Sequence, residues 1–133
     1  MALDKPNERS VGLVWAGNPA HSNDRNRSYQ LAQFAPLQRH RIACYSLQVG
    51  PASRQPAPEG MPVTRLGDGL HDFSETAAAL AALDLLITVD TSVAHLAGAL
   101  GTTVWLILPS NPDWRWGREG DRTPWYPSMR LFR

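Results

Sequence analysis

Three short, almost entirely apolar runs constrain the fold of this chain most strongly. They are VGLVWA at Val11–Ala16, LLITV at Leu85–Val89 and TVWLIL at Thr103–Leu108. Runs of this length that end at polar or turn residues are typical of strands buried on both faces. Segments with helical spacing lie between them, and strands that alternate with helices favour a parallel sheet with right-handed crossovers. The sequence therefore predicts an α/β fold: a Rossmann-like open parallel sheet with helices on both faces.

The remaining elements follow from local patterns and turn residues. Val49 to Pro62, rich in Pro, Gly and Ser, predicts a long surface loop. We expect further strands at Arg41–Leu47, Val63–Leu66 and Met129–Phe132, and the Leu85–Val89 strand in the centre of the sheet. Helices are expected at Tyr29–Gln38 with Ser28 as its cap, from Asp72 or Ser74 to Leu83, and at Asp90–Leu100 with Gly101 ending it.

Length and composition bound the possible functions. A chain of 133 residues fits one domain; we expect residues 1–10 to be disordered or extended and residues 11–133 to form the domain. The net charge of +1 argues against a nucleic-acid or membrane partner held by bulk electrostatics. No run approaches the roughly 20 apolar residues of a membrane span, and residues 1–10 lack an apolar signal core. These features favour a cytoplasmic protein.

Cys44 is the only cysteine, so it is expected to be a buried structural thiol without a disulfide partner.

Ligands of open parallel sheets bind beyond the carboxyl ends of the strands. That rule selects the loop after Trp15, the loop after Leu47, and the segment from Val89 to Ser92. In the last segment a buried strand gives way to a helix, so Thr91 and Ser92 offer hydroxyls beside unpaired N–H groups at the positive end of a helix dipole. This arrangement suits a diphosphate. The alternative is that Asp90 or Thr91 simply caps the helix.

Two further groups of residues are candidates at these ends. His95 lies one turn beyond Thr91, where it contacts either a phosphate or the rest of the protein. The loop from Gly17 to Ser28 carries Asn18, Arg25 and Arg27, and it serves either as an anion site or as a solvated surface loop. His21, His40 and His71 lack metal-ligand spacing, so we propose no metal. Walker, GxGxxG and GxSxG motifs are absent from the sequence.

Several of these segments together resemble one family. The run VDTSVAHLAGALGTTVWLILPSNPDWRW, residues 89–116, looks like the C-terminal signature of heptosyltransferase-like glycosyltransferases. It is most similar to the version that bacterial proteins fuse to tetratricopeptide repeats. The opening VGLVWAGNPAHSNDRNRS, the strand YSLQ and the ending PWYPSMRLFR match the same group.

The resemblance implies a GT-B architecture, in which two Rossmann-like halves face each other and the C-terminal half holds the donor nucleotide. This chain corresponds to that half. By resemblance, Thr91, Ser92 and His95 lie at the diphosphate, Asp90 shapes the turn, and Arg25 or Arg27 with Ser28 approach the phosphates. Ser46 to Gln48 and the turn at Gly67 to Gly69 lie nearer the nucleoside. The expected nucleotide-sugar-binding set is Gly17, Asn18, Arg25, Arg27, Ser28, Gln48, Asp90, Thr91, Ser92 and His95.

The function implied is donor binding for transfer of a sugar from a nucleotide diphosphate sugar, without metal or cofactor. The family places acceptor groups and the catalytic base in the half that this chain lacks, and its members continue beyond the position of Arg133. We therefore name no catalytic residue and expect no activity from this half alone. The expected partners are the sugar nucleotide and the missing half, or a repeat domain, of a parent protein. Alternatives are a non-catalytic interaction module and half of a sugar-nucleotide epimerase.

Four aromatic residues either line the interdomain cleft or form a satellite cluster: Trp114, Trp116, Trp125 and Tyr126.

Overall fold

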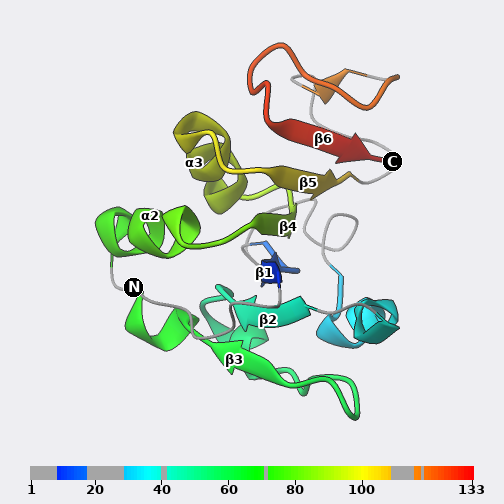
Figure 1. Cartoon of the computed structure of the whole chain (residues 1–133), viewed down its shortest axis with the longest axis vertical. Helices are drawn as coiled ribbons and strands as arrows, with labels where there is room; N and C mark the ends of the chain where they lie inside the picture. The colour runs from blue at the N-terminus through cyan, green and yellow to red at the C-terminus, as the bar shows by residue number, and fades with distance from the viewer. Residues whose placement is uncertain (1–8, 18–28, 40–41, 71, 109–115, 118) are drawn as a thin grey trace.

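Six parallel strands run through the middle of the molecule (Figure 1). The computed structural model describes residues 9–17, 29–39, 42–70, 72–108, 116–117 and 119–133. Every strand pairs in parallel with its neighbours in the order β3-β2-β1-β4-β5-β6, which is the Rossmann order. The strands are β1 (Arg9–Val14), β2 (Ile42–Ser46), β3 (Val63–Arg65), β4 (Leu85–Val89), β5 (Val104–Ile107) and β6 (Met129–Phe132). The predicted α/β fold is confirmed, with β1 and β4 in the centre.

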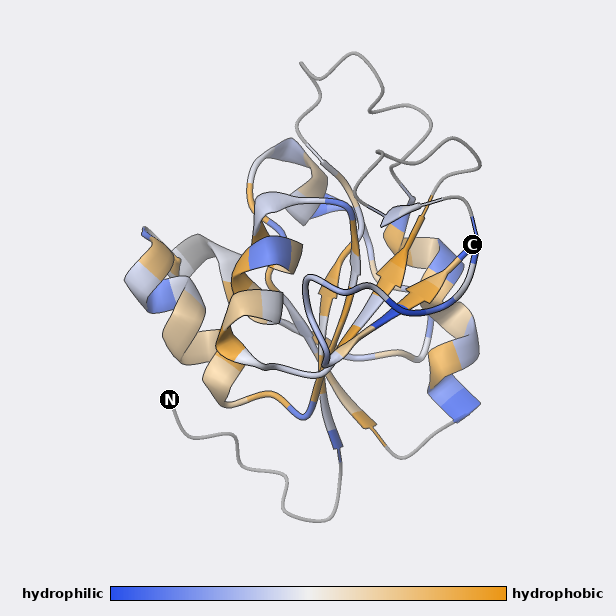
Figure 2. Ribbon diagram, turned by 90° about the horizontal axis from the view of Figure 1, so that it is seen from above, coloured by the Kyte–Doolittle hydropathy of each residue, from blue (hydrophilic) through white to orange (hydrophobic). Residues whose placement is uncertain are grey.

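Helices cover both faces of this sheet. The helices α2 (Phe73–Ala81) and α3 (Ser92–Leu100) pack on one face, where Leu80, Ala97 and Leu106 belong to the same buried cluster. The 3₁₀ helix η1 (Leu31–Arg39) packs on the other face through Leu31 and Phe34. Figure 1 shows α2 and α3 on the opposite side of the strands from the cyan η1. In Figure 2 the strands are mostly orange, as expected for a sheet buried between two layers.

The two α-helices begin and end at residues that suit these positions. Asp72 precedes α2, and its carboxylate accepts a hydrogen bond from the Glu75 N–H at 2.9 Å. Gly101 follows α3 with φ 78°, the left-handed conformation that closes a helix end without a Cβ penalty. The sequence predicted Asp72 as a candidate cap of α2 and Gly101 as the residue that ends α3. However, α3 begins at Ser92 rather than Asp90, with Thr91 in the N-cap position.

The helix predicted at Tyr29–Gln38 forms as a 3₁₀ helix, η1, from Leu31 to Arg39. Pro36 lies inside it and has no N–H to donate, which disfavours a continuous α-helix there. Its start is held by side-chain oxygens: Gln33 accepts from the Gln30 N–H at 2.7 Å and Gln55 accepts from the Leu31 N–H at 2.9 Å. Ser28, its predicted cap, lies outside the described residues.

The predicted surface loop at 49–62 has more structure than its composition indicated. It contains the short 3₁₀ helix η2 (Pro51–Arg54), and Met61 near its end is buried in the core beside η1. A further 3₁₀ turn, η3 (Gly67–Gly69), follows β3 where a turn was predicted.

Cys44 is buried as expected, and burial raises the pKa of its thiol. No helix within the described part of the chain has the length and apolarity to cross a membrane.

Candidate functional site

The carboxyl ends of β1 and β4 lie side by side at the point where the strand order reverses. From β1 the chain continues to β2 on one side, whereas from β4 it continues to β5 on the other. Connections that leave in opposite directions open a crevice between the two strand ends, and such a crevice is the usual ligand site of an open α/β sheet. Two of the three segments that the sequence selected therefore meet at this switch point: the residues after Trp15 and those after Val89.

The first turn of α3 presents its backbone N–H groups at this crevice without a side-chain cap. Thr91 has the extended backbone of an N-cap residue, yet its hydroxyl makes no capping hydrogen bond to the helix. The hydroxyl instead lies 3.3 Å from that of Thr88 in the preceding strand. Asp72, by contrast, caps α2 in the ordinary way. The helix dipole and the uncapped donors favour an anion at the start of α3.

Asp90 and His95 form a hydrogen-bonded network with aromatic residues of the C-terminal segment. The indole N–H of Trp116 donates to Asp90 Oδ2 at 3.0 Å, and His95 Nε2 lies 3.5 Å from Asp90 Oδ1. His95 Nδ1 is 3.0 Å from the Tyr126 hydroxyl, and the imidazole stacks on the Trp116 ring with centroids 5.3 Å apart. Both predicted site residues thus contact the protein itself, and through Trp116 and Tyr126 they fix the C-terminal segment against α3.

Gln48, predicted near the nucleoside, is buried and its amide bonds to the backbone at the end of β1. Its Oε1 accepts from the N–H groups of Trp15 and Ala16 at 2.9 and 3.0 Å, and its Nε2 donates to the Ala16 carbonyl at 3.0 Å. The side chain therefore extends the pairing of β1 and β2 beyond the last residues of the strands. Through these hydrogen bonds Gln48 positions the start of the first loop.

The predicted loop after β1 is described only at its two ends. Gly17 is half-buried at its beginning, and the Tyr29 N–H donates to the Trp15 carbonyl at 2.6 Å where the loop returns. The predicted anion-binding residues Asn18, Arg25, Arg27 and Ser28 lie outside the described residues. Trp15 is fully buried, and its indole N–H has no acceptor among the residues that the structure describes. An acceptor at this point would offset the desolvation cost of that group.

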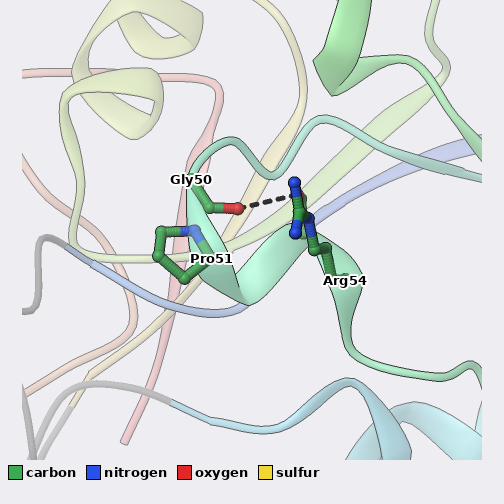
Figure 3. A pocket seen from close by; sticks show the side chains of 4 residues that line it. Gly50, Pro51 and Arg54 are labelled. Atoms are coloured by element: carbon green, nitrogen blue, oxygen red, sulfur yellow. Dashed lines mark hydrogen bonds between the residues drawn. The ribbon is translucent and has the colours of Figure 1, made fainter.

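The loop after β2 forms a hollow beside this edge of the sheet. A space of about 480 Å³ is lined by Gly50, Pro51, Ser53 and Arg54, and Figure 3 shows Arg54 opposite Gly50 and Pro51. Arg54 is exposed and forms no ion pair with any described residue. Adjacent strands are about 4.8 Å apart, so the ends of β2 and β4 are separated by about 10 Å. The position of this loop at a strand end predicted a ligand segment, but no sequence pattern distinguished Arg54.

The aromatic residues of the C-terminal segment have different surroundings. Trp116 is buried in the main core and Tyr126 packs against that core, so these two rings do not form the separate satellite cluster of the sequence interpretation; Trp125 is exposed. Trp114 lies outside the described residues. Among the described residues no group of three or more His, Cys, Asp or Glu side chains is placed to hold a metal ion.

Comparison with known proteins shows a partial similarity to a bacterial protein. Protein FlbA of Caulobacter vibrioides is 39% identical over 61 residues, which are 46% of this chain and 10% of FlbA. The matched segment therefore spans about a tenth of that relative's length. No family model and no solved structure matches the chain.

Proposed function

We propose that this domain binds a nucleotide diphosphate sugar at the carboxyl edge of the sheet, as the donor-binding half of a two-domain glycosyltransferase. The observation that supports it best is the uncapped start of α3 at the switch point between β1 and β4. Backbone donors at a helix N-terminus bind a diphosphate without a metal ion. The family resemblance of the sequence motifs supplies the rest of the proposal: the sugar, the transfer reaction and the second half.

The diphosphate lies at Thr91 and Ser92 in this proposal, and the nucleoside extends across the end of β1 toward the hollow at Arg54. The distance of about 10 Å between the ends of β4 and β2 suits an extended nucleoside diphosphate. Arg54 then offers guanidinium donors to the oxygen atoms of the ribose or base. Asp90, His95 and Gln48 act on the site indirectly, because their side chains hold the loops around it.

Donor binding of this kind also assists transfer. When the sugar leaves, negative charge develops on the nucleoside diphosphate, and fixed donors at the start of α3 stabilise that charge where it forms. The acceptor site and the catalytic base belong to the second half in this proposal. The isolated domain is thus a binding protein whose activity requires its partner half.

A charge introduced at the start of α3 tests the proposal. Ser92→Glu places a carboxylate in the first turn, which stabilises the helix by about 0.3–1 kcal/mol but repels a diphosphate. We expect thermal-shift and calorimetric titrations with UDP, GDP, ADP, CMP and their sugars to show selective binding by the wild type and at least about tenfold weaker binding by the variant.

Ser74→Glu is the matched control, because Ser74 lies in the first turn of α2, away from the switch point. It should give a similar stabilisation without weakening nucleotide binding. Equal affinity of wild type and Ser92→Glu for the best nucleotide would exclude the start of α3 as the diphosphate site.

A further inference from the structure

The imidazole of His95 has partners that suit both its neutral and its protonated form. Its Nε2 lies 3.5 Å from Asp90 Oδ1, so an N–H at this nitrogen points to a carboxylate in either form. Its Nδ1 lies 3.0 Å from the Tyr126 hydroxyl, which donates to a bare nitrogen and accepts from an N–H. The side chain is 29% exposed, so solvent can deliver the proton. A proton can therefore bind here without the loss of either contact.

The stacking of His95 on Trp116 is also compatible with a charged ring. The two ring planes are inclined by 26°, and the face of an indole attracts cations. The Trp116 N–H meanwhile donates to the other oxygen of Asp90. Imidazole is the side chain that most readily changes charge near neutral pH. His95, Asp90, Trp116 and Tyr126 thus form a cluster that can take up or release one proton.

Among the described residues that pack on α3, Asp90 and Tyr126 are the titratable groups in contact with the imidazole. The strands beneath α3, β4 and β5, contain no titratable residue. The charged residues of α2 and of the described part of the C-terminal segment form no ion pair with His95: Asp72, Glu75, Glu119, Asp121, Arg122, Arg130 and Arg133.

The position of Asp90 connects this cluster to the start of α3. Asp90 directly precedes Thr91, the N-cap residue, so its carboxylate lies next to the first turn of the helix. A carboxylate and a diphosphate carry like charges and compete for the same positive helix end. A proton on His95 offsets the carboxylate charge and leaves the hydrogen bond from Trp116 intact. Proton binding and diphosphate binding then favour each other, and such coupling is reciprocal.

We propose that binding of the donor diphosphate is coupled to uptake of a proton by His95, which acts through Asp90 rather than by contact with the phosphates. This inference rests on the proposed function, since it concerns the regulation of the same site by pH. Its sign follows from the coupling. Because the protonated form binds the ligand better, donor affinity falls as the pH rises and His95 loses its proton.

Calorimetry of the whole chain, in buffers with different heats of ionisation, measures the protons taken up on binding. The probes are UDP-glucose, GDP-mannose and ADP-glucose. Their diphosphate is esterified at both ends, so it lacks the terminal phosphate ionisation near neutral pH that would confuse a titration with free UDP. We expect the wild type to take up a fraction of a proton per bound ligand between about pH 6 and about pH 9. Its affinity should fall at least about threefold over that range.

Three variants assign the proton. His95→Gln keeps a polar side chain but cannot be protonated, so proton uptake and the pH dependence of affinity should both vanish. Asp90→Asn keeps an oxygen acceptor for the Trp116 N–H and removes the charge. It should lose most of the uptake and bind at least about threefold more tightly than the wild type at the alkaline end. Asp121→Asn is the matched control, because Asp121 pairs with Arg130, and it should behave as the wild type does.

The possible failures have different meanings. Binding without proton uptake overturns the coupling and leaves the donor site in place. Uptake that persists in Asp90→Asn also overturns it, because His95 then contacts the phosphates directly, and uptake that persists in His95→Gln assigns the proton to another group. If Asp90→Asn does not fold, the wild type and His95→Gln still decide whether His95 takes up the proton. Absence of binding by every probe overturns both the coupling and the proposed function.

Discussion

Ser10 and Asp84 hold the amino ends of β1 and β4 together. The Ser10 N–H donates to Asp84 Oδ2 at 2.8 Å, and the Asp84 N–H approaches both the hydroxyl and the carbonyl of Ser10. The backbone hydrogen bond from Ser10 is the main cause that lowers the pKa of Asp84, and the Ser10 hydroxyl and Arg9 add to it. The ionised carboxylate therefore contributes to stability.

The sign of this contribution predicts a pH dependence. A lowered pKa means that the stabilisation is present above the ordinary aspartate pKa and is lost as the pH falls through the folded-state value. Asp84→Asn keeps an acceptor but removes the charge, so we expect it to lower stability at pH 7 by about 0.5 kcal/mol, since solvent screens an exposed carboxylate. Urea unfolding should show this difference at pH 7 and should lose it at an acidic pH below the lowered pKa of Asp84. The same difference at both pH values would contradict the role of the charge.

Individual side chains were the part of the candidate site least predictable from the sequence. The position of Gln48 after a strand and that of His95 one turn beyond Thr91 indicated that both lie near a ligand site, but these positions carry no information on their hydrogen bonds. Gln48 bonds to backbone 32 residues before it, and His95 bonds to Tyr126, 31 residues after it. Partners that distant are set by tertiary packing, which no local pattern specifies.

At the scale of elements, the contact of α3 with the C-terminal segment depends on a glycine in the middle of the helix. A Cβ at Gly98 would lie 2.5 Å from Tyr126 Cγ, so the ring packs directly on the helix backbone there. Tyr126 in turn bonds to His95. Glycine at this position thus permits the contact that fixes the segment beside the candidate site.

Gly98→Ala should therefore destabilise the protein although alanine favours helices. We expect a loss of about 1–3 kcal/mol from overpacking, measured by thermal or urea unfolding. Gly69→Ala is the control, because a Cβ there meets no atom within 4 Å. The double variant Gly98→Ala with Tyr126→Ala should lose less stability than the two single variants together. Simple additivity would show that the ring is not the cause.

The strands were the most predictable elements, because a continuous apolar run such as LLITV is stable only when buried on both faces. The ends of helices were predicted less well. Asp90 is an ordinary N-cap type, yet its carboxylate bonds to Trp116 and the cap position falls to Thr91. The helix predicted at Tyr29–Gln38 is a 3₁₀ helix because Pro36 lies inside it. This proline was visible in the sequence, but the prediction followed the apolar spacing instead.

For the whole molecule, the general arrangement of the strands could be inferred from the sequence. The position of apolar surface that no helix covers could not. Alternating elements predicted a parallel sheet, and the order that places β1 beside β4 creates the crevice at their carboxyl ends. The exposure of side chains on β5 and β6 depends on which helices cover which strands. Trp105 lies in a run that looks fully buried, and only the three-dimensional arrangement shows its exposure.

Donor binding is the proposed role of the crevice at the carboxyl ends of the strands. The central claim is that the start of α3 binds a nucleoside diphosphate. Amide chemical shifts of the ¹⁵N-labelled chain, titrated with UDP, GDP and ADP, test it most directly. We expect saturable shifts that are largest at Ser92, Val93 and Ala94, with smaller ones near Arg54. Unchanged shifts at the start of α3 with every nucleotide would contradict it.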